Sequence, residues 1–146
     1  MKKLLLILVV SFFALGIYAQ NSGFGIGVMV GEPTGLSAKL WTGDAMAAQF
    51  GVAWSMDSYM HIHGDMIMHV FNVVDVSQGE LPFYVGLGAR LLFADDLTVG
   101  VRVPLGAAYQ FDSAPFDLFL EVVPILNLVP VTDFDINGAI GFRYFF

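Results

Sequence analysis

The sequence motif His61-x-His63-x-Asp65 places three side chains with metal-binding chemistry at alternate positions. Alternate residues of a β-strand point to one face, so these three share a face if the segment is extended. Two histidines at i and i+2 lie about 7 Å apart at a rise of about 3.3 Å per residue, and converging rings can then hold one metal ion. Asp65 and His69 lie about 13 Å and 26 Å from His61 by the same rise, too far for either to join both histidines.

His61 and His63 are therefore the candidate metal ligands that remain. The neighbouring strands are expected to offer Gln49 and Tyr84, and neither is a favoured zinc ligand. We predict no bound metal and no cofactor. We interpret the histidines as titratable polar groups, whose protonation at low pH would shift the local charge balance.

Catalytic chemistry finds little support in the sequence. Ser55 and Ser58 lie close to His61, but no acid completes a triad at a defensible spacing. The chain has no cysteine, which removes thiol catalysis, disulfides and thiolate metal sites. We therefore expect no enzyme activity and no catalytic residue.

The elements that would position these side chains are short alternating segments separated by turn residues. Their even number and hairpin spacing predict an all-β fold, an eight-stranded antiparallel up-and-down transmembrane β-barrel. Its longest connection is expected at 71–81. The eight predicted strands cover residues 23–31, 35–42, 45–55, 58–70, 82–93, 97–111, 116–127 and 134–146.

The N-terminal segment has the pattern of a secretory signal peptide. Two lysines precede an apolar run over residues 4–15, and Ala19 ends the segment with the small residue of a cleavage site. We predict a signal peptide at 1–19, cleaved after Ala19, and an outer-membrane barrel domain at 20–146. An uncleaved N-terminal anchor is the alternative.

The composition favours a membrane protein. The chain is 57% hydrophobic and 13% charged, with a mean hydropathy of +0.73, whereas soluble domains average about 25% charged residues. Without residues 1–19, four basic and thirteen acidic residues remain, a formal charge of −9. We therefore expect no nucleic-acid partner, since phosphate binding needs clustered lysine and arginine.

The charges follow the period of the predicted strands. All four basic residues of the predicted mature chain and four of its acids fall on the less apolar strand faces, whereas the other nine acids lie in turns or at strand ends. A sheet in lipid turns its apolar face outward and closes on itself, so these eight charges would share a narrow lumen and need to be paired there. This predicted lumen charge network comprises Lys39, Asp65, Arg90, Arg102, Asp117, Glu121, Asp135 and Arg143.

Glycine is concentrated on the same charge-bearing face, which indicates crowding there, because an eight-stranded barrel is only just wide enough for its side chains. These glycines are Gly25, Gly27, Gly51, Gly86, Gly88, Gly100, Gly106 and Gly141. Pro104 and Pro124 lie inside predicted strands, where we expect bulges or kinks.

Aromatic residues gather toward the strand ends, as in the interfacial girdles of membrane barrels. They are Trp41, Trp54, Tyr59, Phe83, Phe93, Phe111, Phe116, Phe134, Tyr144 and Phe146.

Three segments of the chain resemble a known group of proteins. The runs Val101–Gly106, Gly86–Leu91 and Gly138–Phe146 are similar to small uncharacterised outer-membrane barrels of spirochaetes and Bacteroidetes, and more broadly to the OmpA/OmpX type of eight-stranded barrel. The resemblance implies the fold and the location but no activity. It also implies that the barrel-assembly machinery reads the C-terminal aromatic row Phe142, Tyr144 and Phe146 as an assembly signal.

These features predict a small barrel of the Gram-negative cell outer membrane, with a structural envelope role or modest surface binding. Its expected partners are outer-membrane lipids and, during biogenesis, the barrel-assembly machinery, with no known small-molecule ligand. One alternative is a porin-like pore or transporter for small solutes. The other is a secreted soluble barrel that binds an apolar ligand inside.

Overall fold

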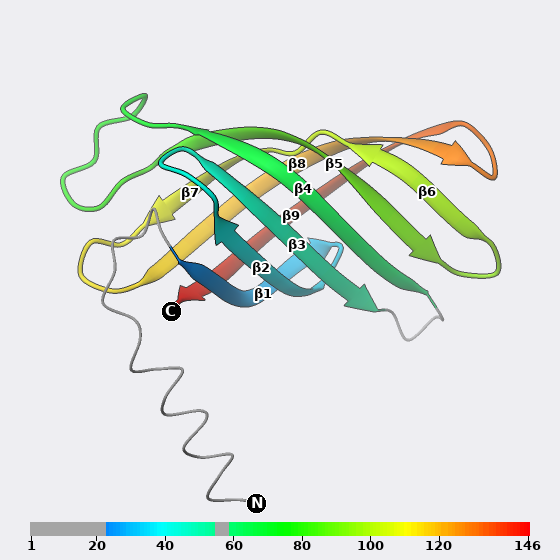
Figure 1. Ribbon diagram of the computed structural model, residues 1–146, viewed down its shortest axis with the longest axis horizontal. Coiled ribbons are helices and arrows are strands. Elements are labelled where there is room, and N and C mark those ends of the chain that lie inside the picture. Colours follow the sequence, from blue (N-terminus) through cyan, green and yellow to red (C-terminus); the bar gives the residue numbers. More distant parts are fainter. Residues whose placement is uncertain (1–22, 55–58) are drawn as a thin grey trace, which may run out of the picture.

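The computed structural model describes residues 23–54 and 59–146 (Figure 1). Across these residues, no helix is long and apolar enough to span a membrane. The predicted signal peptide at 1–19, with its cleavage site after Ala19, lies outside the described residues, as do Ser55 and Ser58.

The described chain forms a closed, eight-stranded antiparallel barrel, as the sequence predicts. Each strand pairs with the next along the chain, and the last strand pairs with the first to close the sheet. One of the eight strands is interrupted and is numbered as two segments, β6 and β7. The bounds are β1 Phe24–Glu32, β2 Gly35–Trp41, β3 Met46–Trp54, β4 Met60–Val70, β5 Phe83–Phe93, β6 Leu97–Arg102, β7 Leu105–Gln110, β8 Phe116–Val129 and β9 Asp133–Phe145.

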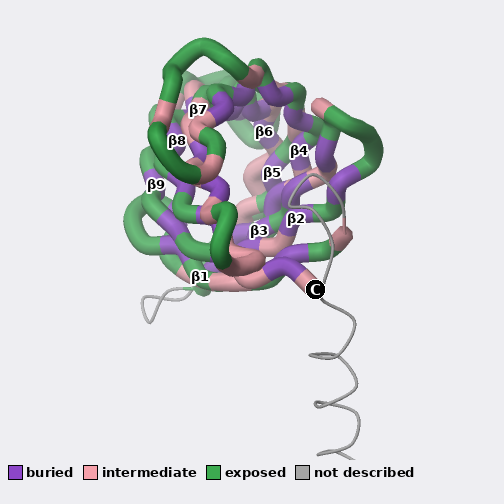
Figure 2. Tube along the Cα trace, turned by 90° about the vertical axis from the view of Figure 1, so that its left-hand side faces the viewer, coloured by how far each residue is buried: buried purple, intermediate pink, exposed green. Residues whose placement is uncertain are grey.

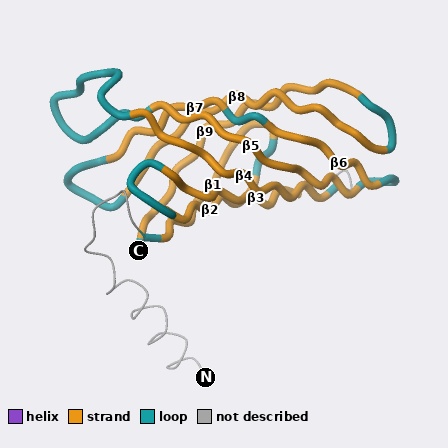
Figure 3. Tube along the Cα trace, turned by 45° about the horizontal axis from the view of Figure 1, so that its top comes forward, coloured by secondary structure: helices purple, strands orange, loops and turns teal. Residues whose placement is uncertain are grey.

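The strands are staggered as well as paired. Following directly opposed residues once around the barrel leads from Phe145 of β9 through Gly25, Lys39, Gln49, Asp65, Gly88, Arg102 and Ile125 to Asp135 of β9. The path returns ten residues away on the same strand, which is the shear that tilts strands in a closed barrel. Figure 3 shows the tilted strands with the loops gathered at the two ends.

The two ends differ in their connections. The end that carries Phe146, here called the C-terminal rim, holds connections 42–45, 71–82 and 111–115. The opposite rim holds the short connections 33–34, 94–96 and 130–132. In Figure 1 the long 71–82 connection lies at the same end as the C-terminus.

Pro104 explains why the sixth strand is interrupted. Proline has no N–H for the ladder, so β6 ends at Arg102 and β7 begins at Leu105. The register does not change across the gap, since Arg102 lies opposite Ile125 and Leu105 opposite Val122. The predicted strand 97–111 is therefore continuous in direction, and backbone hydrogen bonds from Val103 to Pro124 and from Gly86 to Pro104 span the gap.

Pro124 behaves differently from the expectation of a bulge or kink. It lies opposite Ile136 within an uninterrupted β8. Its carbonyl accepts a hydrogen bond from the N–H of Val103 at 3.0 Å. The register shift between β6 and β8 occurs at Val99 and Gly100 instead.

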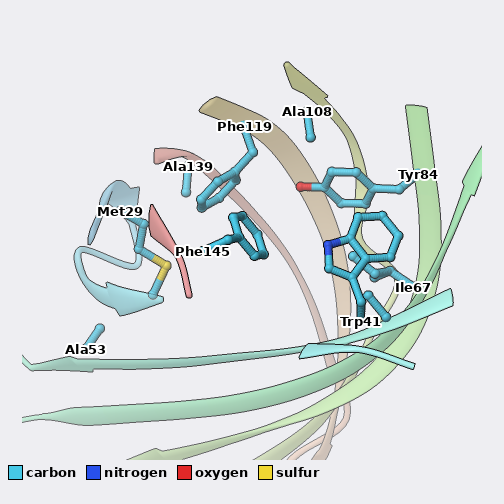
Figure 4. Close-up of a cluster of buried hydrophobic side chains, with 10 residues drawn as sticks. Met29, Trp41, Ala53, Ile67, Tyr84, Ala108, Phe119, Ala139 and Phe145 are labelled. Carbon is cyan, nitrogen blue, oxygen red and sulfur yellow. The ribbon is translucent and has the colours of Figure 1, made fainter. Parts of the chain in front are cut away.

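Buried and exposed residues alternate along the strands (Figure 2). The eight glycines predicted for the crowded face are buried or half-buried. The lumen also holds a cluster of apolar side chains, including Trp41, Tyr84, Phe119 and Phe145 (Figure 4).

Trp41 is 7% exposed, so its assignment to an outer aromatic girdle was wrong. It follows Lys39 by two residues, and that spacing puts both side chains on the inner face.

Candidate functional site: the charged lumen

All eight residues of the predicted charge network take part in ion pairs. Five pairs join them: two link neighbouring strands, and three link strands that are two or three apart in the sheet. Seven of the eight residues are buried, and Asp135 is the half-buried exception. The network divides into a central group, a group near the C-terminal rim and a group near the opposite rim.

The central group is built around Arg102. Its Nε donates to Oδ1 of Asp65 at 3.0 Å, and its Nη2 lies 3.7 Å from Oε1 of Glu121. The amide of Gln49 donates to Oδ2 of Asp65 at 3.0 Å and to Oε2 of Glu121 at 3.2 Å. The hydroxyl of Tyr84 donates to the same Glu121 oxygen at 2.8 Å. One cation and two neutral donors thus hold two carboxylates in the interior.

The group near the C-terminal rim is centred on Asp117. Arg143 donates through Nε to Oδ1 of Asp117 at 3.1 Å, and Nζ of Lys39 lies 3.7 Å from Oδ2. Lys39 also lies 2.8 Å from Nε2 of His69 and 4.3 Å from the centre of the Trp41 ring. The Lys39 ammonium is therefore held by a carboxylate, an imidazole and an aromatic face together.

The group near the opposite rim uses Arg90. Its Nη2 donates to Oδ1 of Asn127 at 2.9 Å and to Oδ2 of Asp135 at 3.1 Å. The Asp135 side chain is 47% exposed, so this pair reaches water. Water screens an exposed ion pair, so breaking this pair should cost less than leaving one partner of a fully buried pair alone.

Glycines allow these side chains to meet across an intervening strand. Asp65 on β4 and Arg102 on β6 are both opposite Gly88 of β5. A Cβ at Gly88 would overlap Oδ1 of Asp65. The missing side chain therefore opens the space in which the ion pair forms.

The same device recurs at two further positions. Tyr84 and Glu121 both lie opposite Gly106, and a Cβ there would overlap the Tyr84 ring. Arg90 and Asn127 both lie opposite Gly100, where a Cβ would come within 2.6 Å of the Asn127 oxygen. The crowding that the sequence indicates on this face is thus a set of crossings between next-nearest strands.

The two candidate metal ligands contact each other. Nε2 of His61 lies 3.0 Å from Nδ1 of His63, and their rings pack edge to face. In the part of the chain that the structure describes, no group of three or more His, Cys, Asp or Glu side chains is arranged to hold a metal ion.

The expectation that Gln49 and Tyr84 neighbour His61 and His63 was wrong. His61 lies opposite Ala53 and Leu92, and His63 lies opposite Gly51 and Arg90. Gln49 and Tyr84 lie opposite Asp65 and His69 instead. The reason is the register, which is set by turns and barrel closure rather than by the strand sequence alone.

Three neutral residues of the network were not identified from the sequence as partners of the charges. Gln49, Tyr84 and Asn127 each hydrogen-bond one or more of the charged side chains. Their position in the alternation could have indicated this role, because each falls on the inner face of its strand together with the charged residues.

The charged side chains form a network of ion pairs inside the barrel. The buried carboxylates and cations contact one another, and Nε of both Arg102 and Arg143 is bonded to a carboxylate. Their Nη atoms make no hydrogen bond within the described residues, and the Arg143 guanidinium lies 3.9 Å from the centre of the Phe119 ring. Comparison with known protein families, with curated proteins and with solved structures found no significant match to the chain.

Proposed function

We propose that this protein is a small barrel of the Gram-negative cell outer membrane, with a structural envelope role or modest surface binding. The observation that carries the proposal is the reversed polarity of the barrel. Seven of the eight charged residues of the network are buried inside, while large apolar side chains are exposed outside on every strand. Leu87, Ile136 and Val122 are 62%, 56% and 51% exposed.

Lipid is the solvent that matches this surface. Soluble monomers rarely expose a contiguous apolar patch larger than about 300–600 Å², whereas here the exposed apolar residues continue around the closed sheet. A closed sheet also leaves no unpaired strand edge, which is the requirement for a β-structure in the bilayer.

The alternative functions fit the interior less well. A soluble barrel for an apolar ligand needs an open apolar lumen and a polar exterior, whereas this barrel has charged side chains in its lumen and an apolar exterior. A solute pore needs a continuous aqueous path, whereas Arg102, Arg143 and Lys39 are fully buried among their partners across the lumen. The filled lumen therefore favours the structural role over a pore or transporter.

Two lysine substitutions on the outer surface test the proposal. We expect Val122→Lys, in the middle of β8, to destabilise the barrel in lipid vesicles by about 2–4 kcal/mol, and Val131→Lys, at the opposite rim, by about 0–1 kcal/mol. Val122 and Val131 are 51% and 69% exposed, so water would tolerate both changes. Equal, small effects of the two variants would contradict a membrane location.

Fractionation of the full chain expressed in a Gram-negative host is the second measurement. We expect the protein in the outer-membrane fraction, migrating on a gel at different positions before and after heating, as folded membrane barrels do. Recovery in the soluble periplasmic fraction would reject the proposal.

A further inference from the structure

The outer wall of the barrel has a hollow over β7. Its volume is about 460 Å³, within the range of about 300–1,000 Å³ typical of small-molecule sites. The outward side chains that line it are apolar: Phe83, Leu105, Ala107, Leu120 and Val122. The other lining residues belong to the inner face of the same three strands.

The hollow exists because a small residue stands between two large ones. Phe83, Ala107 and Leu120 form one row across β5, β7 and β8. Phe83 and Leu120 are 40% and 58% exposed and rise as walls on either side of Ala107. The groove opens on the outer surface of the barrel, which contacts lipid in the proposed function.

The groove lies close to the C-terminal rim. Glu80 pairs with Gln110 three residues beyond the Phe83–Ala107 pair, about 10 Å along the strand at a rise of about 3.3 Å per residue. The connection around Glu80 is held down by the hydroxyl of Tyr109, which donates to the carbonyl of Gln78 at 2.7 Å. A lipid chain lying in the groove would thus bring its headgroup to this rim.

The described connections of this rim carry charges of one sign. Connections 42–45, 71–82 and 111–115 contain no lysine or arginine. They carry the exposed acids Asp44, Asp75, Glu80 and Asp112. Such a rim attracts an ammonium group and repels a headgroup of net negative charge.

We propose that the groove over Ala107 binds an acyl chain of a phospholipid whose headgroup carries an ammonium group, taken from the leaflet at the C-terminal rim. The inference rests on the proposed membrane location. The apolar lining selects a hydrocarbon chain, and the acidic rim selects a zwitterionic headgroup over an anionic one.

Native mass spectrometry of the purified full-length protein tests the groove. The protein is supplied with an equimolar mixture of palmitoyl-oleoyl phosphatidylethanolamine and phosphatidylglycerol, and the retained lipid is weighed directly. We expect Ala107→Phe to lower retained phosphatidylethanolamine by about fivefold, which corresponds to about 1 kcal/mol of lost packing contacts. Ala89→Phe adds the same ring to an exposed outward position on β5 outside the groove and should retain lipid as the parent does.

Leu120→Ala removes a wall rather than filling the groove, so it gives the same test if Ala107→Phe does not fold. The double variant Glu80→Gln with Asp112→Asn tests the headgroup and should make retention of the two lipids equal. The proposal is overturned if Ala107→Phe and Ala89→Phe retain lipid equally, or if the parent retains both lipids equally. Either result, in variants that still fractionate with the outer membrane, would leave the proposed function intact.

Discussion

The lumen and the two rims of this barrel both carry carboxylates, but in opposite surroundings. Eight charged residues meet in the lumen, and every ion pair found within the described residues lies there. Eight described acids lie at the rims, all of them exposed: Glu32, Asp44, Asp75, Glu80, Asp95, Asp96, Asp112 and Asp133. A carboxylate is thus a structural element in one region and a solvated group in the other.

The difference follows from the local dielectric. A charge taken out of water needs a partner, and removing that partner from a buried pair is strongly destabilising. An exposed carboxylate keeps its hydration and contributes little to stability. The losses in unfolding free energy caused by matched substitutions in the two regions should therefore differ by several kcal/mol.

The largest effect is expected from a residue at the rim, and it exceeds the effect of any substitution in the lumen. We expect deletion of Phe146, or Phe146→Lys, to block insertion into the outer membrane. Phe146 ends the outward row of Phe142 and Tyr144, and its ring lies 5.1 Å from that of Tyr144. A lysine near the interface costs only about 0–1 kcal/mol in lipid, so a severe defect indicates lost recognition by the assembly machinery.

The control for this experiment is Phe142→Lys, which changes an earlier aromatic of the same row. Outer-membrane yield and heat-modifiability of both variants are the measurements. Normal assembly of Phe146→Lys would refute the recognition of the terminal aromatic.

The next effect contrasts a lumen cation with a rim acid. We expect Arg102→Ala to destabilise the barrel by about 3–5 kcal/mol, because Asp65 and Glu121 lose their cation. Asp95→Ala should change stability by less than about 0.5 kcal/mol. Urea unfolding in lipid vesicles measures both, and equal effects would mean that the network does not contribute as its burial indicates.

Two tyrosine hydroxyls give a finer comparison. The Tyr84 hydroxyl donates to buried Glu121 at 2.8 Å, whereas the Tyr109 hydroxyl donates to an exposed carbonyl at 2.7 Å. We expect Tyr84→Phe to cost about 1.5–3 kcal/mol and Tyr109→Phe less than about 1 kcal/mol. A larger cost at Tyr109, measured by the same unfolding assay, would reverse the ranking of lumen and rim.

The smallest expected effect concerns the space between charges. Gly88→Ala adds a Cβ that overlaps Asp65, so we expect a cost of about 1–3 kcal/mol from overpacking. Gly43→Ala, in a rim turn, meets its nearest neighbour, Cβ of Met46, only at 4.0 Å and should change stability by less than about 0.5 kcal/mol. If the two alanine variants have the same unfolding free energy, the ion pair between Asp65 and Arg102 is not tightly packed over Gly88.

Much of the barrel was predictable from the alternation of residue types. The predicted strands agree closely with those observed, and residues such as Lys39 and Arg143 lie inside as their position in the period requires. Trp41 is the exception among the girdle aromatics: it lies near a strand end, but its alternation with Lys39 turns it inward. The bulges or kinks expected at the two prolines are not what the structure shows: the strand is interrupted at Pro104 without a change of register, and Pro124 lies within a continuous strand.

Which charges pair could not be read from the chain. Arg102 and Asp65 are 37 residues apart and meet only because β4, β5 and β6 align with Gly88 between them. The groove over Ala107 likewise depends on the row that joins it to Phe83 and Leu120. The sequence by itself determined which face each side chain occupies, since the period of two is a local property of an extended chain. Only the tertiary structure decided which side chains meet, because register and shear arise from the turns and from closing the sheet.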